Sequence, residues 1–331
     1  MSELYPLKFE PLLKEKVWGG DTLVKKYGKR APESIKIGES WEVSAVEDNL
    51  SVAVNGYLAG NNIRELIEVF MGDLTGDKVY EKFGNEFPLL IKFIEAREDL
   101  SVQVHPSDSL ARERHNANGK TEMWYILESE KDAIIYSGFH EPVTRDIYLN
   151  ALREGKIVSL LNAESCTRGD VFFIPAGRIH ATGAGTLLAE IQQTSDITYR
   201  IYDWDRKSDN GPARELHNDL ALGAIDFSSS GRSVIKKPAL LNKTETLVGC
   251  EYFDTNIIQF DRAVEKDYRR LDSFVVYLCT EGKFSVRWND GEEKAVKGET
   301  LLLPASLKEV VLIPEERSTL LEIYINTGQN L

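Results

Sequence analysis

The chain has 331 residues, of which 42% are hydrophobic and 28% charged, and its formal net charge at pH 7 is -13. This length and composition are typical of a globular protein with about two domains. Nucleic acids and anionic membranes repel so acidic a protein unless it carries a basic cluster, and the sequence shows no such cluster. We therefore expect neither nucleic acid nor a membrane as a partner.

The cysteines and the first residues indicate a compartment. Cys166, Cys250 and Cys279 lie far apart without C-x-x-C spacing, which fits a reducing cytoplasm better than a disulfide framework. The N-terminus lacks the apolar core of a signal peptide, and no run reaches the apolar length of a bilayer span. We expect a cytoplasmic protein and favour a monomer.

Strand patterns dominate the first hundred or so residues. Residues 37–44 and 51–54 have strand character, and helical spacing behind an Asn predicts a small insertion over about residues 60–86. An apolar strand at 88–96 then contains Lys92. Burying an ammonium group costs several kcal/mol unless an anion meets it, so Lys92 is a functional candidate unless it reaches solvent at an exposed edge.

A short alternating strand follows at residues 100–105. Side chains alternate between the two faces of a strand, so Ser101, Gln103 and His105 share one face. Imidazole is the commonest metal ligand, and the carbonyl oxygen of Gln103 can join it on that face. We expect this strand to form a hairpin with the preceding strand.

The next segments supply further candidates. A strand beginning at Lys120 places Glu122 on the same face, a pair that is usually solvated and contributes little. Residues 141–162 show helical spacing, and a Pro/Gly turn then leads to His180 at the start of a strand. Glu190 lies in an apolar strand, and Arg200 lies between aromatic residues.

The last third of the chain begins with a polar segment and then returns to strand patterns. Residues 207–230 are expected to form a third insertion that is helical only in part, and strand signals resume after residue 238. We therefore expect a catalytic domain at 1–238 and a C-terminal domain at 239–331. His115, His140 and His217 lie in loops or beside insertions and are expected at the surface.

An internal repeat links the two halves. Residues 121–126 align with 273–278, and residues 169–176 align more closely with 298–305, which indicates two related β-barrels. In the second copy Phe274 replaces Glu122 and Glu309 replaces His180. These candidate ligands are therefore not required to build the strands, which argues that they serve a function other than folding.

The first copy thus offers two imidazoles, one carboxylate and one amide oxygen. Without a thiolate, this set suits Zn²⁺, Mn²⁺, Fe²⁺ or Co²⁺ in an open site inside a barrel. Three cations, Lys92, Lys120 and Arg200, are available for an anionic small molecule despite the acidic chain.

Four motifs resemble type I mannose-6-phosphate isomerase in its short bacterial form. They are Q-V-H-P at 103–106, K-x-E at 120–122, G-D-x-F-F-I-P-A-G-x-x-H-A at 169–181, and S-D-x-T-Y-R-x-Y-D-W-D-R at 195–206. The resemblance covers most of residues 4–206 and, less specifically, the C-terminal barrel. Eukaryotic members usually carry Pro at the position of Thr121 and a larger helical insertion.

The resemblance implies a mainly β fold of two cupin-type jelly-roll barrels with small helical insertions. It also implies one zinc ion per chain and the interconversion of mannose 6-phosphate and fructose 6-phosphate through an enediol or enediolate. The matching zinc ligands are Gln103, His105, Glu122 and His180. The matching catalytic positions are Arg200, Lys120 and Glu190, and the substrate-pocket positions are Trp18, Lys92 and Ser101. We expect Lys92 and Ser101 to help hold the phosphate, whereas the choice between Lys120 and Glu190 as the proton-transfer base stays open.

Two alternatives compete with this interpretation. Two histidines and a carboxylate also describe the non-haem iron site of a cupin oxygenase or decarboxylase, but Gln103 and the three cations argue against it. The other alternative is a cupin that binds a sugar without catalysis, and it would need no metal.

Overall fold

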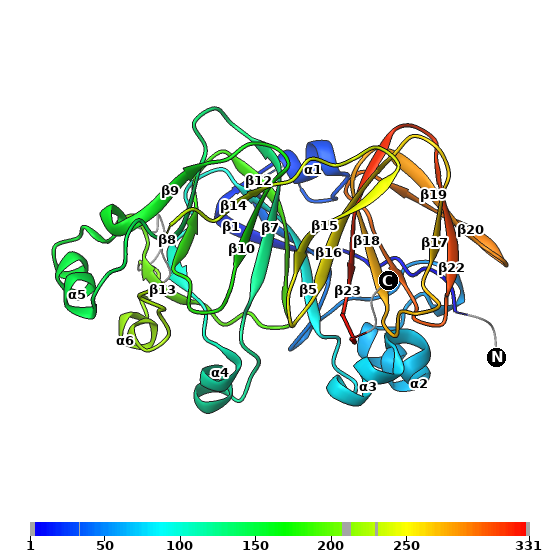
Figure 1. Cartoon of the computed structure of the whole chain (residues 1–331), viewed down its shortest axis with the longest axis horizontal. Coiled ribbons are helices and arrows are strands. Elements are labelled where there is room, and N and C mark those ends of the chain that lie inside the picture. Colours follow the sequence, from blue (N-terminus) through cyan, green and yellow to red (C-terminus); the bar gives the residue numbers. More distant parts are fainter. Residues whose placement is uncertain (1–3, 33, 207–212, 229–230, 329–331) are drawn as a thin grey trace.

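The computed structural model describes residues 4–32, 34–206, 213–228 and 231–328. The fold is mainly β, as predicted, with antiparallel sheets and short helices (Figure 1). In the described residues, one pair of large sheets is built from strands before residue 237 and a second pair from strands after residue 242. None of the described helices is both long and apolar enough to span a membrane.

The N-terminal barrel consists of a seven-stranded and a five-stranded sheet. The seven-stranded sheet has the order β1 (Leu12–Gly20), β2 (Ile37–Val43), β5 (Leu89–Ala96), β12 (Thr186–Gln193), β7 (Glu122–Ser129), β10 (Asp170–Ile174) and β14 (Val234–Lys236). The five-stranded sheet has the order β13 (Tyr199–Tyr202), β6 (Val102–Val104), β11 (His180–Thr182), β8 (Ile134–Phe139) and β9 (Leu161–Ser165). Buried side chains of both sheets, including Trp124 and Ile135, pack in one apolar cluster.

The C-terminal barrel consists of a five-stranded and a four-stranded sheet. The first has the order β15 (Lys243–Gly249), β16 (Asp254–Phe260), β23 (Ser318–Tyr324), β18 (Val275–Glu281) and β21 (Thr300–Leu303). The second has the order β17 (Val264–Asp267), β22 (Glu309–Pro314), β19 (Lys283–Trp288) and β20 (Gly291–Val296).

Both barrels have the same connectivity. The order β5-β12-β7-β10 corresponds to β16-β23-β18-β21, and β6-β11-β8-β9 corresponds to β17-β22-β19-β20. This is the strand order of a jelly roll, and it confirms the repeat expected from the sequence. Glu122 begins β7 where Phe274 directly precedes β18, and His180 begins β11 where Glu309 begins β22. At the strand positions that carry the candidate ligands in the first barrel, the second barrel therefore has other side chains.

Four of the described helices lie within the predicted insertions: α2 (Ile63–Thr75), α3 (Asp77–Phe83), α5 (Arg145–Arg153) and α6 (Asn218–Leu222). Two others, α1 (Thr22–Tyr27) and α4 (Asp108–His115), were not predicted, and single 3₁₀ turns occur at Gly56–Leu58 and Ile157–Leu160. The side chain of Asn62 accepts hydrogen bonds from the first-turn amides of α2, as the predicted Asn cap requires. Residues 207–212 and 229–230 of the third predicted insertion lie outside the described residues.

Two local predictions were wrong. Residues 51–54 form isolated bridges instead of a strand, beside the short hairpin of β3 (Ala45–Val46) and β4 (Asn49–Leu50). β5 and β6 do not form a hairpin, because the turn between them crosses from one sheet to the other. This crossing places Lys92 and Gln103 on different sheets of one barrel, and both line the same cavity.

The two barrels share an apolar core. Leu7 pairs with Leu302 of β21, and the rings of Phe87 and Phe274 lie 4.5 Å apart between centroids. Figure 1 shows β5 beside the strands of the second barrel. The proposed domain boundary between residues 238 and 239 stays a prediction.

Candidate active site

Three buried side chains from separate strands converge in the N-terminal barrel. His105 directly follows β6, Glu122 begins β7 and His180 begins β11. Each is at most 1% exposed, and their nitrogen and oxygen atoms lie within 4.8 Å of one another. Strands from the two facing sheets are needed to bring these residues together, which explains why their sequence spacing alone does not reveal the cluster.

Hydrogen bonds to backbone carbonyls fix the tautomer of both imidazoles. The Nδ1 atom of His105 donates to Ile197 O at 2.9 Å, and that of His180 donates to Arg178 O at 2.8 Å. Burial lowers the pKa of His105 to about 3 and also lowers the pKa of His180, so both rings are neutral. Each Nε2 atom therefore carries a lone pair, and each lies 3.3 Å from an oxygen of Glu122.

The Glu122 carboxylate is buried with unsatisfied oxygens. Neither oxygen accepts a hydrogen bond from a described residue, although Lys120 Nζ lies 3.1 Å from Oε2. Burial opposes its ionisation, but the charge of Lys120 and the contact with His105 outweigh burial and hold the pKa of Glu122 well below its usual range. Two acceptor nitrogens facing an ionised carboxylate repel it unless a cation lies between them, so the donor set fits a metal ion.

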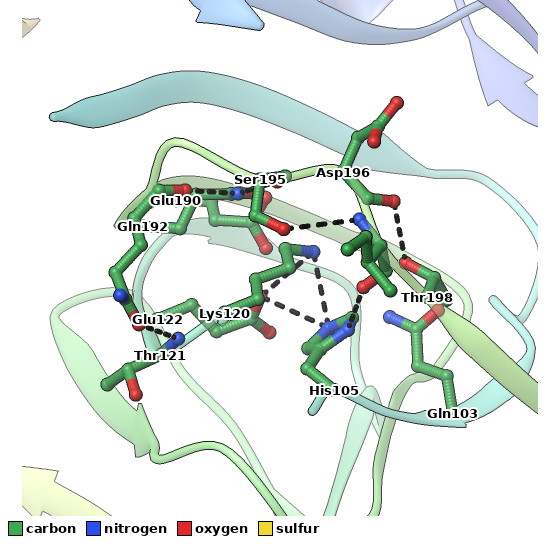
Figure 2. Close-up of polar contacts among 12 residues, drawn as sticks. Gln103, His105, Lys120, Thr121, Glu122, Glu190, Gln192, Ser195, Asp196 and Thr198 are labelled. Atoms are coloured by element: carbon green, nitrogen blue, oxygen red, sulfur yellow. Dashed lines mark hydrogen bonds and ion pairs between the residues drawn. The ribbon is translucent and has the colours of Figure 1, made fainter. Parts of the chain in front are cut away.

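Gln103 completes the set from the middle of β6. It lies directly opposite His180 on one side and Arg200 on the other. Its Nε2 atom lies 3.2 Å from Nε2 of His180. A half-turn of the amide exchanges nitrogen for oxygen and directs a carbonyl ligand at the same point. In Figure 2 the Gln103 side chain lies on one side of His105, and Lys120 and Glu122 lie on the other side.

A cavity of about 220 Å³ opens beside this cluster. It brings together seven of the ten predicted site residues: Trp18, Lys92, Ser101, Gln103, Lys120, Glu190 and Arg200. The other three are the buried cluster itself, and Lys120 bridges the two groups because its Nζ lies 3.2 Å from His105 Nε2.

Lys92 and Glu190 form a buried ion pair across neighbouring strands. Their side chains are opposite in the β5–β12 ladder, and Nζ lies 2.7 Å from Oε2. Burial opposes ionisation of Lys92, yet Glu190 and Glu39 outweigh it and raise its pKa. Burial and the negative charge of Glu122 raise the pKa of Glu190 despite Lys92. The anion that a buried Lys92 requires is therefore present, and Glu190 binds a proton more readily than an exposed glutamate does.

The remaining predicted residues line the cavity walls. Trp18 and Ser101 are buried, whereas Arg200 is half-buried. Arg200 Nη1 donates to Glu215 O at 2.8 Å, and its Nε atom has no hydrogen-bond partner among the described residues. A guanidinium held by one edge leaves donors available for an oxygen in the cavity.

Several lining residues were not predicted from the sequence. The polar and aromatic ones include Lys16, Glu39, Trp41, Asp196, Thr198 and Arg214. The alternation along residues 37–43 places Glu39 and Trp41 on one face and is the signal that identifies them. Nothing in the sequence indicates Arg214, because it lies outside the helices and strands that periodic patterns reveal.

The other histidines largely lie where predicted. His115 and His140 are exposed, but His217 is half-buried and accepts a hydrogen bond from the backbone N–H of Arg200 at 3.1 Å. The expectation that His217 is a plain surface residue was therefore wrong, because β13 and the start of α6 pack together.

Fold and site together define a double-barrel cupin protein with a candidate metal centre in its N-terminal barrel. Residues 6–136 match the model of the phosphomannose isomerase type I catalytic domain. Mannose-6-phosphate isomerase ManA of Bacillus subtilis is 36% identical over 313 residues, which cover 93% of this chain and 95% of that protein. Mannose-6-phosphate isomerase of Streptococcus mutans is 34% identical, with coverage of 92% and 93%.

A crystal structure of mannose 6-phosphate isomerase from Bacillus subtilis matches the fold with a TM-score of 0.85 and 30% sequence identity. The match covers 97% of this chain and 100% of that chain. The chain belongs to the type I mannose-6-phosphate isomerase family.

Replacing either imidazole should abolish metal binding. We expect His105→Ala and His180→Ala each to lose stoichiometric metal, because each would remove one of the three donors of the candidate metal site. Metal content after gel filtration measures this, with His140→Ala as the control for an exposed histidine. Retention of one metal ion per chain by both variants would refute the ligand assignment.

The buried imidazoles should make the metal-free protein sensitive to acid. His105 has a folded pKa of about 3, far below the unfolded value, so the unfolded chain binds more protons below about pH 6.5 and stability falls as the pH falls. Between pH 6.5 and 5 this residue contributes a loss of about 2 kcal/mol. Denaturant unfolding of wild type and His105→Gln measures it, and equal pH slopes for the two proteins would contradict the expectation.

Proposed function

We propose that the protein interconverts mannose 6-phosphate and fructose 6-phosphate by moving a proton between C1 and C2. The observation that carries the proposal is the cavity that joins a buried cation-binding cluster to Lys120, Glu190 and Arg200, in a chain of this family. A coupled assay with mannose 6-phosphate tests it, together with metal analysis. Iron-dependent oxygen uptake without isomerisation would favour the oxygenase alternative, and metal-free sugar binding alone would favour the non-catalytic one.

The metal is proposed to be one zinc ion per chain, held by Gln103, His105, Glu122 and His180. Two neutral imidazoles, one carboxylate and an amide oxygen suit Zn²⁺, although Mn²⁺, Fe²⁺ and Co²⁺ accept similar ligands. When bound, the ion supplies Lewis-acid stabilisation of negative charge on a substrate oxygen. Reconstitution of the metal-free protein with each ion separates these choices.

The residues of the chain supply the proton transfer. Removal of the C2 proton of the aldose gives an enediolate; return of that proton to C1, with transfer of the hydroxyl proton from O2 to O1, gives the ketose. Arg200 lines the cavity, and its guanidinium would stabilise the developing negative charge on oxygen. We propose Glu190 as the base, because it lines the cavity and its raised pKa makes it a stronger base than an ordinary glutamate, whereas Lys120, 3.1 Å from Glu122, would donate hydrogen bonds.

Substrate contacts are assigned to Trp18, Lys92 and Ser101. All three are buried and line the cavity. Trp18 offers an apolar face, Ser101 offers a hydroxyl, and Lys92 holds Glu190 in place through their 2.7 Å ion pair. The cytoplasmic location and the monomeric state stay predictions.

Removing the Arg200 guanidinium should separate metal binding from catalysis. We expect Arg200→Ala to keep stoichiometric metal and to lose about a hundred- to a thousandfold in kcat, as removal of a donor to a developing oxyanion typically does. Arg200→Lys is the matched variant and should recover part of the loss because it restores the charge without the fork. An unchanged kcat in Arg200→Ala would show that Arg200 is not catalytic.

A further inference from the structure

A chain of hydrogen bonds connects the C-terminal barrel to the start of β7. It begins at Tyr252, in the turn between β15 and β16, whose hydroxyl donates to Asp108 Oδ2 at 2.9 Å. The other oxygen of Asp108 accepts from Nε2 of Gln193 at 3.0 Å, and Oε1 of Gln193 accepts from the backbone N–H of Thr121 at 2.8 Å. The chain therefore ends one residue before Glu122.

Asp108 is the first residue of α4 and is the centre of this chain. Its Oδ1 atom also accepts from the backbone N–H of Gly119 at 2.8 Å. A Cβ atom on Gly119 would lie 2.5 Å from the backbone nitrogen of Asp108, so the two ends of the segment 108–119 are in direct contact. Burial opposes ionisation of Asp108, but the three hydrogen-bond donors outweigh burial and lower its pKa. The carboxylate therefore stays charged and accepts three charge-assisted hydrogen bonds.

Gln193 extends the pairing of β7 with β12 beyond the last paired residues. Gln192 lies opposite Glu122, and the backbone N–H of Gln193 donates to Thr121 O at 3.2 Å. The Gln193 side chain then supplies the acceptor for the Thr121 N–H, at the point where β12 ends. Thr121 is 4% exposed and Gln193 is 7% exposed, so an unpaired N–H here would be costly. The orientation of the Gln193 amide therefore fixes the backbone at Thr121.

The backbone at Thr121 in turn places two functional side chains. Lys120 and Glu122 flank it, and their charged groups lie 3.1 Å apart. The hydroxyl of Thr121 also accepts from the backbone N–H of Ala176, in the turn that leads to His180. A shift of this backbone would displace a hydrogen-bond donor of the cavity and the carboxylate of the candidate metal site together, and displacements of about 1 Å can cost a large factor in rate.

We propose that Tyr252 of the C-terminal barrel is a positioning residue for the active site, which acts through Asp108 and Gln193 to hold Lys120 and Glu122 in place. Tyr252, Asp108 and Gln193 are not among the described residues that line the active-site cavity, so their effect is indirect. The barrel that lacks the candidate ligands thereby contributes to the reaction. The inference rests on the proposed function for its effect on turnover, but not for its effect on metal binding.

The first test is Tyr252→Phe, which removes the hydroxyl and keeps the ring that packs against the shared apolar core. With saturating zinc, we expect kcat for mannose 6-phosphate to fall about three- to tenfold and KM to stay within about twofold. The Kd for zinc, measured by competition with a chelator, should rise by a similar factor. Amide hydrogen exchange at Gly119 and Thr121 should become faster, because their hydrogen-bond acceptors are held less firmly.

Arg168→Gln is the control for a general loosening between the barrels. It breaks an exposed ion pair of Arg168 with Glu281 of β18, which is not part of the hydrogen-bond chain. This variant should leave kcat and the Kd for zinc within about twofold.

A double-mutant cycle tests whether the effect passes through Asp108. Asp108→Ala should lower kcat at least as much as Tyr252→Phe does, because it removes the acceptor of all three hydrogen bonds. Adding Tyr252→Phe to Asp108→Ala should then have no further effect, since coupled residues are not additive.

Three results would overturn the inference: an unchanged kcat and zinc Kd in Tyr252→Phe, equal losses in Arg168→Gln, or additive losses in the double variant. Absence of isomerisation by the wild-type protein would instead refute the proposed function. In that case the zinc Kd and the amide exchange still test Tyr252. A weaker zinc affinity with faster exchange in Tyr252→Phe supports its positioning role, and wild-type values of both contradict it.

Discussion

The buried Glu122 carboxylate is the constraint on which the rest of the site depends. An ionised carboxylate costs several kcal/mol to bury unless charges and hydrogen bonds compensate it. Around Glu122, compensation comes from Lys120 at 3.1 Å, while two neutral imidazoles direct lone pairs at its oxygens. The arrangement is incomplete without a further cation, and this incompleteness distinguishes a binding site from a structural ion pair.

The second barrel provides the internal comparison. It also buries a carboxylate, Glu322, but here the partners are complete: Lys266 Nζ lies 2.8 Å from Oε1, Asn256 donates to Oε2 at 2.8 Å, and Tyr268 donates to Oε1. Two jelly rolls with the same strand order thus differ in whether protein side chains fully compensate the buried carboxylate. The C-terminal barrel satisfies its charge with its own side chains, whereas the N-terminal barrel leaves both oxygens of Glu122 without a hydrogen-bond donor among the described residues.

The sequence predicted residues better than it predicted their arrangement. Alternation along a strand was enough to group Gln103 with His105, and the repeat was enough to show that Glu122 and His180 are not needed for folding. Strand pairing was harder to predict from the sequence. The predicted hairpin of β5 and β6 was wrong because these consecutive strands of the jelly roll lie in different sheets. Arg214 was missed because periodic patterns carry no information on a residue that lies outside the helices and strands.

Anomalous diffraction at the zinc absorption edge tests the central claim most directly. Crystals of the active enzyme should show one anomalous peak inside the N-terminal barrel, about 2.0–2.2 Å from nitrogen of His105 and His180 and from oxygen of Glu122. The second barrel should show no peak beside Glu322, whose oxygens are already satisfied. A fully active crystal without an ion among these three residues would contradict the account.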